Sequence, residues 1–196
     1  MTTETSRRSP VVVPADPAWA DRGLALTDRL RELLGPTAVR VEHIGSTAIP
    51  GMAAKEVFDV QVSVGDLDAA ELAFAEPLAD AGYELRPYRH DHVPAGLTDD
   101  PERWTKRMWQ RRAATEQGPA VNLHVRLVGS PNERLALLFR DWFRAHPAAV
   151  PAYAEFKTVL AGTVDGVGVY SEVKDPVVDL VVAVAEEWAA ETGWTA

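Results

Sequence analysis

The sequence contains no cysteine, which excludes disulfide bonds, thiol nucleophiles and thiolate metal sites. It also lacks a long apolar run: the stretch MTTETSRRSPVVVPADPAW holds only three consecutive valines, too few for a signal-peptide core or a membrane span. Basic residues number 20 against 29 acidic ones, and the formal charge of −9 argues against non-specific binding to nucleic acid. We therefore expect a cytoplasmic protein that binds neither nucleic acid nor a membrane.

What is present is the composition of an ordinary globular protein. The chain has 196 residues, of which 46% are hydrophobic and 25% charged, enough for a substantial core and too apolar for a disordered chain. No internal repeat, low-complexity segment or long linker divides it. We expect a single domain over residues 1–196, with a sheet-containing core over about 10–128 and a helical part over 130–192.

Alternating apolar residues and turn residues predict a series of short strands. Between them, residues 45–55 carry two glycines and a proline and predict a loop with one helical turn, and residues 87–103 predict a surface loop. The strands are expected at 11–13, 38–44, 56–64, 83–88, 104–112 and 120–128, the last two joined through TEQGP as a hairpin.

Apolar residues at helical spacing predict the remaining elements. Ser130, Pro131 and Glu133 form a capping box, and Asp175-Pro176 looks like a second capped helix start. Helices are expected at 17–34 behind Asp16, at 66–81, from 131 to His146-Pro147, from there through Leu160, and at 175–190. The fold class is therefore α+β: a mixed β-sheet flanked by helices, with a helical C-terminal part.

The segment VEHIGSTAIPGMAAKEVFDVQVSV, residues 41–64, places a glycine turn between two strands. Alternation along the second strand puts Asp59 and Gln61 on the same face. A turn at Gly45 and Ser46 can direct backbone N–H groups and a hydroxyl at phosphate oxygens, because glycine lets a ligand approach closely. A tight turn with a helix cap explains the same residues without a ligand, so both interpretations stay open.

Asp59 is the most informative side chain of this segment. A carboxylate amid VFDVQV would cost several kcal/mol if it were buried unpaired, so a metal, a cation or solvent must compensate it. Because hard cations prefer oxygen ligands, Asp59 predicts Mg²⁺ held against phosphates.

Lys55 either reaches a phosphate, pairs with Asp59 or is solvated. His43 and His124 are either structural or join Asp59 in a metal or acid–base site.

Three further residues are candidates for anion contacts. Arg107 belongs to the basic stretch RWTKRMWQRR, which is either a solvated strand face or an anion-binding patch. Tyr170 and Lys174 flank the predicted start of the last helix, and a helix N-terminus favours anions. They form either a second anion contact or a cap region.

The run HIGSTAIPGMAAKEVFDVQVSV, followed by NLHV, LLFRDWFRAHP and YSEVK, resembles the GrpB family (UPF0157), which is fused to dephospho-CoA kinase in some actinobacteria. That family resembles the nucleotidyltransferase superfamily, whose signature is a Gly-Ser or Gly-Gly turn followed on the next strand by Asp-x-Asp or Asp-x-Glu. The resemblance implies a nucleotidyltransferase-like fold. It also implies that Gly45 and Ser46 form the phosphate-binding turn and that Asp59 is the first metal carboxylate.

The sequence departs from this signature at Gln61, which stands where the superfamily has its second carboxylate. An amide oxygen can coordinate a metal but brings no charge, so two-metal catalysis should be weakened or lost. A third carboxylate is not evident either, since the polar candidates on the later strand are Asn122 and His124. The sequence therefore carries the superfamily's phosphate cradle more clearly than its metal chemistry.

Two functions follow from these residues. The first is a Mg²⁺-dependent enzyme that binds a nucleoside triphosphate and transfers a nucleotidyl or phosphoryl group to a small acceptor, with Asp59 on the metal. The phosphates and the developing charge would be held by Gly45, Ser46, Thr47, Lys55 and either Arg107 or Lys174. The second is a catalytically inactive nucleotide-binding or folding-accessory module for a partner such as dephospho-CoA kinase.

Overall fold

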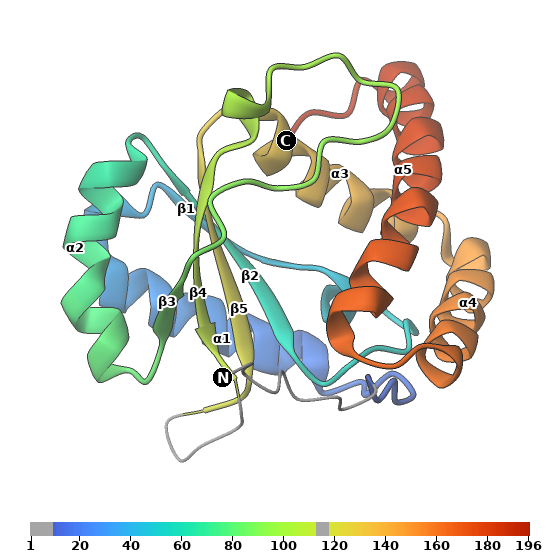
Figure 1. Ribbon diagram of the computed structural model, residues 1–196, viewed down its shortest axis with the longest axis horizontal. Helices are drawn as coiled ribbons and strands as arrows, with labels where there is room; N and C mark the ends of the chain where they lie inside the picture. The colour runs from blue at the N-terminus through green and yellow to red at the C-terminus, as the bar shows by residue number, and fades with distance from the viewer. Residues whose placement is uncertain (1–9, 113–117) are drawn as a thin grey trace, which may run out of the picture.

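A computed structural model of the protein describes residues 10–112 and 118–196, and these residues form a mixed five-stranded sheet (Figure 1). The strands lie in the order β1-β2-β5-β4-β3, in which β2 and β5 run parallel and all other neighbours run antiparallel. The strands are β1 (Arg40–Ile44), β2 (Phe58–Val64), β3 (Glu84–Arg86), β4 (Lys106–Arg111) and β5 (Val121–Leu127).

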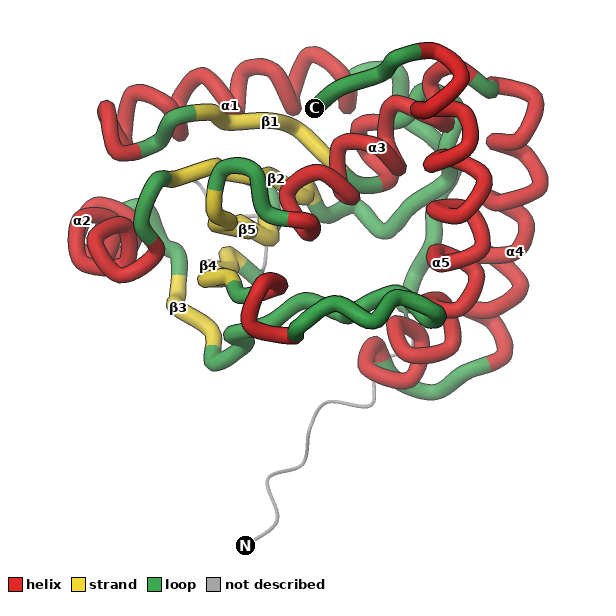
Figure 2. The backbone as a smooth tube through the Cα atoms, turned by 90° about the horizontal axis from the view of Figure 1, so that it is seen from above, coloured by secondary structure: helices red, strands yellow, loops and turns green. Residues whose placement is uncertain are grey.

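Helices cover both faces of the sheet, α1 and α2 on one and α3, α4 and α5 on the other (Figure 2). The fold class is thus the predicted α+β arrangement with a helical C-terminal part. In the described parts of the chain, no helix is long and apolar enough to cross a membrane. The helices are α1 (Trp19–Leu34), α2 (Leu67–Asp80), α3 (Pro131–Ala145), α4 (Val150–Thr163) and α5 (Val167–Thr192), with 3-10 turns at Gly35–Thr37, Ser46–Ala48, Pro101–Trp104 and Pro147–Ala149.

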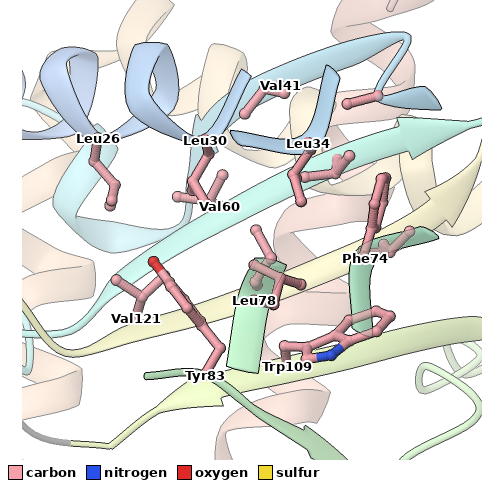
Figure 3. Packing of buried hydrophobic residues seen from close by; sticks show 14 of the residues in the cluster. Leu26, Leu30, Leu34, Val41, Val60, Phe74, Leu78, Tyr83, Trp109 and Val121 are labelled. Atoms are coloured by element: carbon pink, nitrogen blue, oxygen red, sulfur yellow. The ribbon is translucent and has the colours of Figure 1, made fainter. Parts of the chain in front are cut away.

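The main core lies between the sheet and the pair α1 and α2 (Figure 3). Leu26, Leu30 and Leu34 recur every four residues along α1, so they form one apolar stripe against the sheet. Val60 and Val62 of β2 point toward this stripe, because alternate strand residues share a face. The alternate residues Asp59, Gln61 and Ser63 are therefore directed to the side that faces the C-terminal helices.

A second apolar cluster fixes the loop between β1 and β2 to the C-terminal helices. Ile49 and Met52 of this loop are buried against Phe143 of α3 and against Val150 and Tyr153 of α4. Close packing of this kind leaves few alternative positions for the backbone. The loop that follows the glycine turn is consequently held between the sheet and α4.

Most of the predicted elements are confirmed, apart from their ends. The apolar segment at 11–13 is the exception among the strands, since Val13 forms only an isolated bridge with Ala54. Strands β4 and β5 are antiparallel neighbours as expected. The proposed hairpin connection TEQGP lies partly outside the described residues.

The last helix begins earlier than the sequence suggests. Asp175-Pro176 was expected to open it, but α5 starts at Val167 and contains Pro176 in its interior. That prediction is wrong, because a proline is tolerated inside a long helix whose packing compensates for one lost hydrogen bond. Tyr170 and Lys174 therefore lie within the helix and do not flank its N-terminus.

The capping box at the start of α3 is only partly formed. Ser130 precedes the helix as predicted, but its hydroxyl donates to the carbonyl of Leu127 at 2.7 Å and does not cap the helix. Glu133 accepts a hydrogen bond at 2.7 Å from the backbone N–H of Gly129, one residue before the expected partner, and pairs with Arg40 of β1. The glutamate thus ties α3 to the edge of the sheet.

Candidate functional site

The sheet face that points toward α3, α4 and α5 carries polar side chains on its two parallel strands. In the register of β2 and β5, Asp59 lies beside Asn122 and Gln61 lies beside His124. Adjacent residues of paired strands point to the same face. Asp59 and Gln61 therefore share a face, as their alternation predicts, and β5 adds an amide and an imidazole to it.

The glycine turn lies directly against Asp59. Gly45 has φ 70° and ψ −169°, a conformation that is essentially restricted to glycine. A Cβ at this position would be 2.5 Å from Oδ2 of Asp59, so the close approach also requires glycine. We call this arrangement, formed by Gly45, Ser46 and Asp59, the glycine corner. The carboxylate is directed at the turn, as a joint phosphate and metal site would require.

Asp59 keeps its negative charge although it is largely covered. Its side chain is 30% exposed, and Oδ1 accepts a hydrogen bond of 2.8 Å from Nδ2 of Asn122. Nε2 of His124 is 3.7 Å from the same oxygen. Burial raises the pKa of Asp59, but the contacts with His124 and Asn122 and the charge of Lys55 together lower it by more. The pKa of Asp59 is therefore below its ordinary value.

Gln61 is not available as a metal ligand. Its Oε1 accepts a hydrogen bond of 2.6 Å from Arg126, and its Nε2 donates to the backbone carbonyl of Glu133 at 3.2 Å. The side chain is 0% exposed. Arg126 also pairs with Asp91 of the loop before β4. The position of the superfamily's second carboxylate is thus occupied by a neutral group in a closed hydrogen-bond network.

The two candidate histidines are on opposite faces of the sheet. His43 pairs with Val60 in the register, so it points to the α1 side, where Nε2 lies 2.8 Å from Oγ1 of Thr47. Burial lowers the pKa of His43 to about 4 against the opposing charge of Asp59, so the ring is neutral at pH 7. The structure does not bring His43 and Thr47 to the sheet face that carries Asp59, but it does place His124 beside Asp59.

His124 is a neutral imidazole beside Asp59. The pKa of His124 is below its ordinary value, because burial and the charges of Arg126 and Lys106 lower it by more than the contact with Asp59 raises it. Within the described residues, the buried Nδ1 of His124 has no hydrogen-bond partner. Since Nε2 faces the carboxylate, the ring is oriented by Asp59 in the manner of a paired acid–base residue.

Sequence reasoning missed the lysine that lies closest to the glycine corner. Lys157 of α4 is 2% exposed, and its Nζ donates a hydrogen bond of 2.8 Å to Oγ of Ser46. The ring of Tyr153 lies 5.3 Å from the ammonium group. Burial, with the charges of Lys174 and Lys55, lowers the pKa of Lys157 to about 7 against the opposing charge of Asp59.

Two of the predicted anion contacts gather beside Lys157. Nζ of Lys55 lies 5.1 Å from the ring centre of Tyr170, which is buried. The pKa of Lys55 is below its ordinary value, because burial and the charge of Lys174 lower it by more than the charge of Asp59 raises it. Among the described residues, none of Lys55, Lys157 and Lys174, which we call the lysine cluster, has a carboxylate within ion-pair distance. Three converging and unpaired ammonium groups are suited to an anion of high charge.

Arg107 is not part of this arrangement. It pairs with Glu71 and Asp68 of α2, on the face of the sheet opposite to Asp59. The basic stretch around it therefore serves, at this residue, to join a strand to a helix. The lysine cluster, which comes from three separate segments, is the remaining candidate for an anion contact.

A pocket of about 220 Å³ adjoins the lysine cluster. It lies between the loop before β4, strand β5 and helices α3 and α5. Lys174 belongs to both the pocket and the lysine cluster, and Trp104, Leu135 and Val178 give the pocket an apolar wall. Asp175 also lines it. The pocket has room for a small group beside Lys174.

Around Asp59, the described residues offer one carboxylate to a magnesium ion and no second one. Oδ2 of Asp59 accepts no hydrogen bond from any described residue, which leaves one carboxylate oxygen for an ion that keeps phosphate and water ligands. In the described parts of the chain, no group of three histidine or acidic residues could hold a metal by itself. A two-metal centre would need the carboxylate that Gln61 replaces.

The comparisons with known proteins place the chain in one family. The model of the family "GrpB protein" matches residues 9–183. A dephospho-CoA kinase of Mycolicibacterium paratuberculosis is 36% identical over 213 residues, which cover 99% of this chain and 50% of that protein. The chain thus spans about half the length of the curated kinase-named relatives that it matches.

Two solved structures were also found to be similar. The crystal structure of the conserved protein GrpB from Enterococcus faecalis superposes with a TM-score of 0.70 and 26% identity, covering 91% of this chain and 99% of that chain. Cid1, described as an RNA terminal uridylyl transferase, superposes with a TM-score of 0.49 and 17% identity, over 76% of this chain and 40% of that chain.

Proposed function

The chain belongs to the GrpB family, and from the site that it builds we propose that it binds a nucleoside triphosphate and transfers a nucleotidyl or phosphoryl group from it to a small acceptor. The observation that carries this proposal is the lysine cluster. Three of the four lysines of a chain with a formal charge of −9 converge without a carboxylate partner among the described residues. Lys157 is buried, and leaving a charge there is unfavourable unless an anion compensates it in the functional state.

In the proposed complex, the phosphates lie between the glycine corner and the lysine cluster. Ser46 offers a hydroxyl to the phosphates, whereas the side of Gly45 where a Cβ would lie is filled by Oδ2 of Asp59. Lys55 and Lys174 supply positive charge from the loop before β2 and from α5. Charge neutralisation and positioning provide most of the catalysis in phosphoryl and nucleotidyl transfer.

Asp59 is the residue that would hold Mg²⁺ beside those phosphates, and the ion would neutralise part of their charge. His124, a neutral imidazole oriented by Asp59, is the group at the site that is suited to accept a proton. The pocket lined by Lys174 and Asp175 would take the acceptor or the nucleoside, whose identity we leave open.

Isothermal titration calorimetry with ATP, GTP, CTP and UTP, with and without Mg²⁺, tests the proposal. We expect at least one triphosphate to bind, and Lys157→Met to weaken binding by about tenfold or more, which corresponds to about 1.4 kcal/mol. Asp59→Asn should remove the dependence on Mg²⁺. Arg107→Gln, on the opposite face of the sheet, is the matched control and should leave the affinity unchanged. Triphosphate binding that Lys157→Met does not alter, or no binding at all, would contradict the proposal.

One observation favours a second function. Because Gln61 is fixed between Arg126 and the carbonyl of Glu133, the site lacks the second carboxylate of a two-metal enzyme. The second candidate is therefore a module that binds the nucleotide without transferring a group. A pyrophosphate and phosphate release assay at saturating triphosphate distinguishes the two, since steady turnover supports the enzyme and binding without release supports the module.

A protein partner belongs to the second candidate. Because this chain matches about half of each kinase-named relative, we propose that a dephospho-CoA kinase is the partner whose folding the module assists. The measurement is the refolding yield of a dephospho-CoA kinase from the same organism with and without this chain. An unchanged yield would contradict the folding role.

A further inference from the structure

Ser46 and Lys157 have the geometry of a nucleophile and its base. Ser46 lies in the glycine corner and is partly exposed, while Lys157 lies behind it and is 2% exposed. The distance from Oγ of Ser46 to Nζ of Lys157 is 2.8 Å. A hydroxyl in hydrogen-bond contact with an adjacent base is the recurring arrangement of an activated serine, and lysine serves as that base in some enzymes.

The surroundings of Lys157 favour the neutral amine that such a base requires. Burial and the charges of Lys174 on α5 and Lys55 before β2 lower its pKa to about 7, while Asp59 on β2 opposes them. On its own helix, the ring of Tyr153 lies 5.3 Å away. A lysine with these neighbours is partly neutral at physiological pH, unlike an exposed lysine with a pKa near 10.4.

We propose that Ser46 is a nucleophile toward phosphorus with Lys157 as its base, and that the chain transfers a nucleotidyl group from the bound triphosphate onto Ser46. This inference rests on the proposed function for its substrate. Oγ of Ser46 forms a bond to the α-phosphorus, and the bond from that phosphorus to the oxygen bridging to the β-phosphate breaks. Pyrophosphate leaves with the electron pair, and the proton of Ser46 goes to Nζ of Lys157.

The three lysines of the lysine cluster then have different roles. Lys55 and Lys174 compensate the charge of the phosphates, and their positive charge keeps Lys157 from holding its proton firmly. It also accounts for Gln61, because a serine that has its own base does not depend on a second metal to activate an attacking hydroxyl. The nucleotidyl-serine formed is an intermediate for transfer to an acceptor or a stable modification, and both share the same first step.

Covalent labelling of the full chain tests the proposal. The probes are the four nucleoside triphosphates labelled at the α-phosphate and, separately, a fluorophosphonate, which reports an activated serine without any nucleotide. Peptide mass mapping should locate both labels on Ser46, with pyrophosphate released in equal amount to the nucleotidyl label. The rate of fluorophosphonate labelling should rise with pH, reach half its maximum near pH 7 and level off, as the pKa of Lys157 requires, and a bound triphosphate should move this midpoint to higher pH, because an anion favours the protonated lysine.

Three variants separate a base from a structural contact. Ser46→Ala should abolish both labels. Lys157→Arg keeps the positive charge but cannot act as a base at neutral pH, so triphosphate binding should persist while labelling falls at least tenfold. Ser171→Ala, whose hydroxyl donates to the carbonyl of Val167 within α5, is the matched serine control and should label like the wild type.

The outcomes distinguish this inference from the function on which it rests. If a triphosphate binds and neither probe labels Ser46, the inference is overturned and the proposed function remains. The same holds if the Lys157→Arg variant is labelled as fast as the wild type. If no triphosphate binds, the proposed function is contradicted. Fluorophosphonate labelling of Ser46 that depends on Lys157 then still supports the nucleophile and its base, and its absence overturns them.

Discussion

At the scale of single residues, the site depends on a contact that only glycine permits. Gly45 combines a positive φ with an approach to Asp59 that leaves no space for a Cβ. The turn itself is confirmed, because glycine followed by a hydroxyl residue between two strands is a turn signal, and its role toward a phosphate stays a prediction. The contact with Asp59 could not be read from the sequence, since it depends on how β1 and β2 pair.

Substitution of Gly45 measures that contact. Gly45→Ala should lower the free energy of unfolding by about 3 kcal/mol, because left-handed strain of about 1–2 kcal/mol adds to the clash with Asp59. Gly51→Ala is the control: Gly51 also has a positive φ, but the nearest atom to its added Cβ would be 3.8 Å away. It should cost about 1 kcal/mol in the same urea titration. Equal losses for the two variants would contradict the proposed close contact.

Lys157 should reduce the stability of the fold at low pH. Its pKa falls from 10.5 to about 7 on folding, so between these values the unfolded chain holds a proton that the folded chain does not. Stability from this group therefore rises with pH across that window and is lowest below pH 7. Lys157→Met should raise the unfolding free energy at pH 6 by about 2 kcal/mol, with a smaller gain at pH 9.

The control for that variant is the other buried lysine. Lys106 pairs with Asp91, so Lys106→Met leaves a buried carboxylate with fewer partners and should destabilise the fold. Chemical denaturation of both variants at pH 6 and pH 9 gives the comparison. A Lys157→Met protein less stable than the wild type at pH 6 would show that this lysine is a structural contact.

At the scale of elements, the sequence predicts most helices and strands because their apolar periods are regular. The start of α5 was missed, since proline at position 176 is a local stop signal that the packing of a long helix overrides. A signal for Lys157 was present: it occupies the buried stripe of α4 together with Val150, Tyr153 and Leu160. A lysine at a core position of a helix is a candidate for function, because lysine is almost never fully buried without a partner.

The side chains that meet at the site come from elements far apart in the sequence, which is why their grouping could not be predicted. The sequence leaves open whether His43 joins Asp59, and the antiparallel register places it on the other face. It also leaves open whether Arg107 lies in an anion patch, and this residue pairs with α2. Both choices require the strand register, which alternation within one strand does not provide.

Arg140 of α3 should make the strongest polar contact between the C-terminal helices and the sheet. It is 8% exposed and donates to Glu42 of β1 at 2.8 Å and to the carbonyl of His43 at 3.0 Å. Arg140→Met should cost about 2 kcal/mol, because partly buried acceptors lose a charged donor. Arg134→Met breaks the exposed pair with Glu186 and should cost less than about 0.5 kcal/mol. Similar thermal shifts for both would contradict this ranking.

At the scale of the whole molecule, an acidic chain encloses a small basic site. The formal charge of −9 disfavours long polyanions, whereas the lysine cluster is local and suits a compact anion. The sheet supplies the glycine corner and Asp59, and α4 and α5 supply Lys157 and Lys174. The site is therefore complete only when both parts of the fold are assembled.

The most direct test of this account is a crystal structure of the chain with a triphosphate whose α,β bridging oxygen is replaced by a non-hydrolysable group, in the presence of Mg²⁺. We predict that the phosphates lie between Ser46 and the lysine cluster, with Asp59 facing the same group. A triphosphate bound elsewhere on the molecule, or bound without contact to Ser46 or Lys157, would contradict the central claim that these residues form a phosphate site.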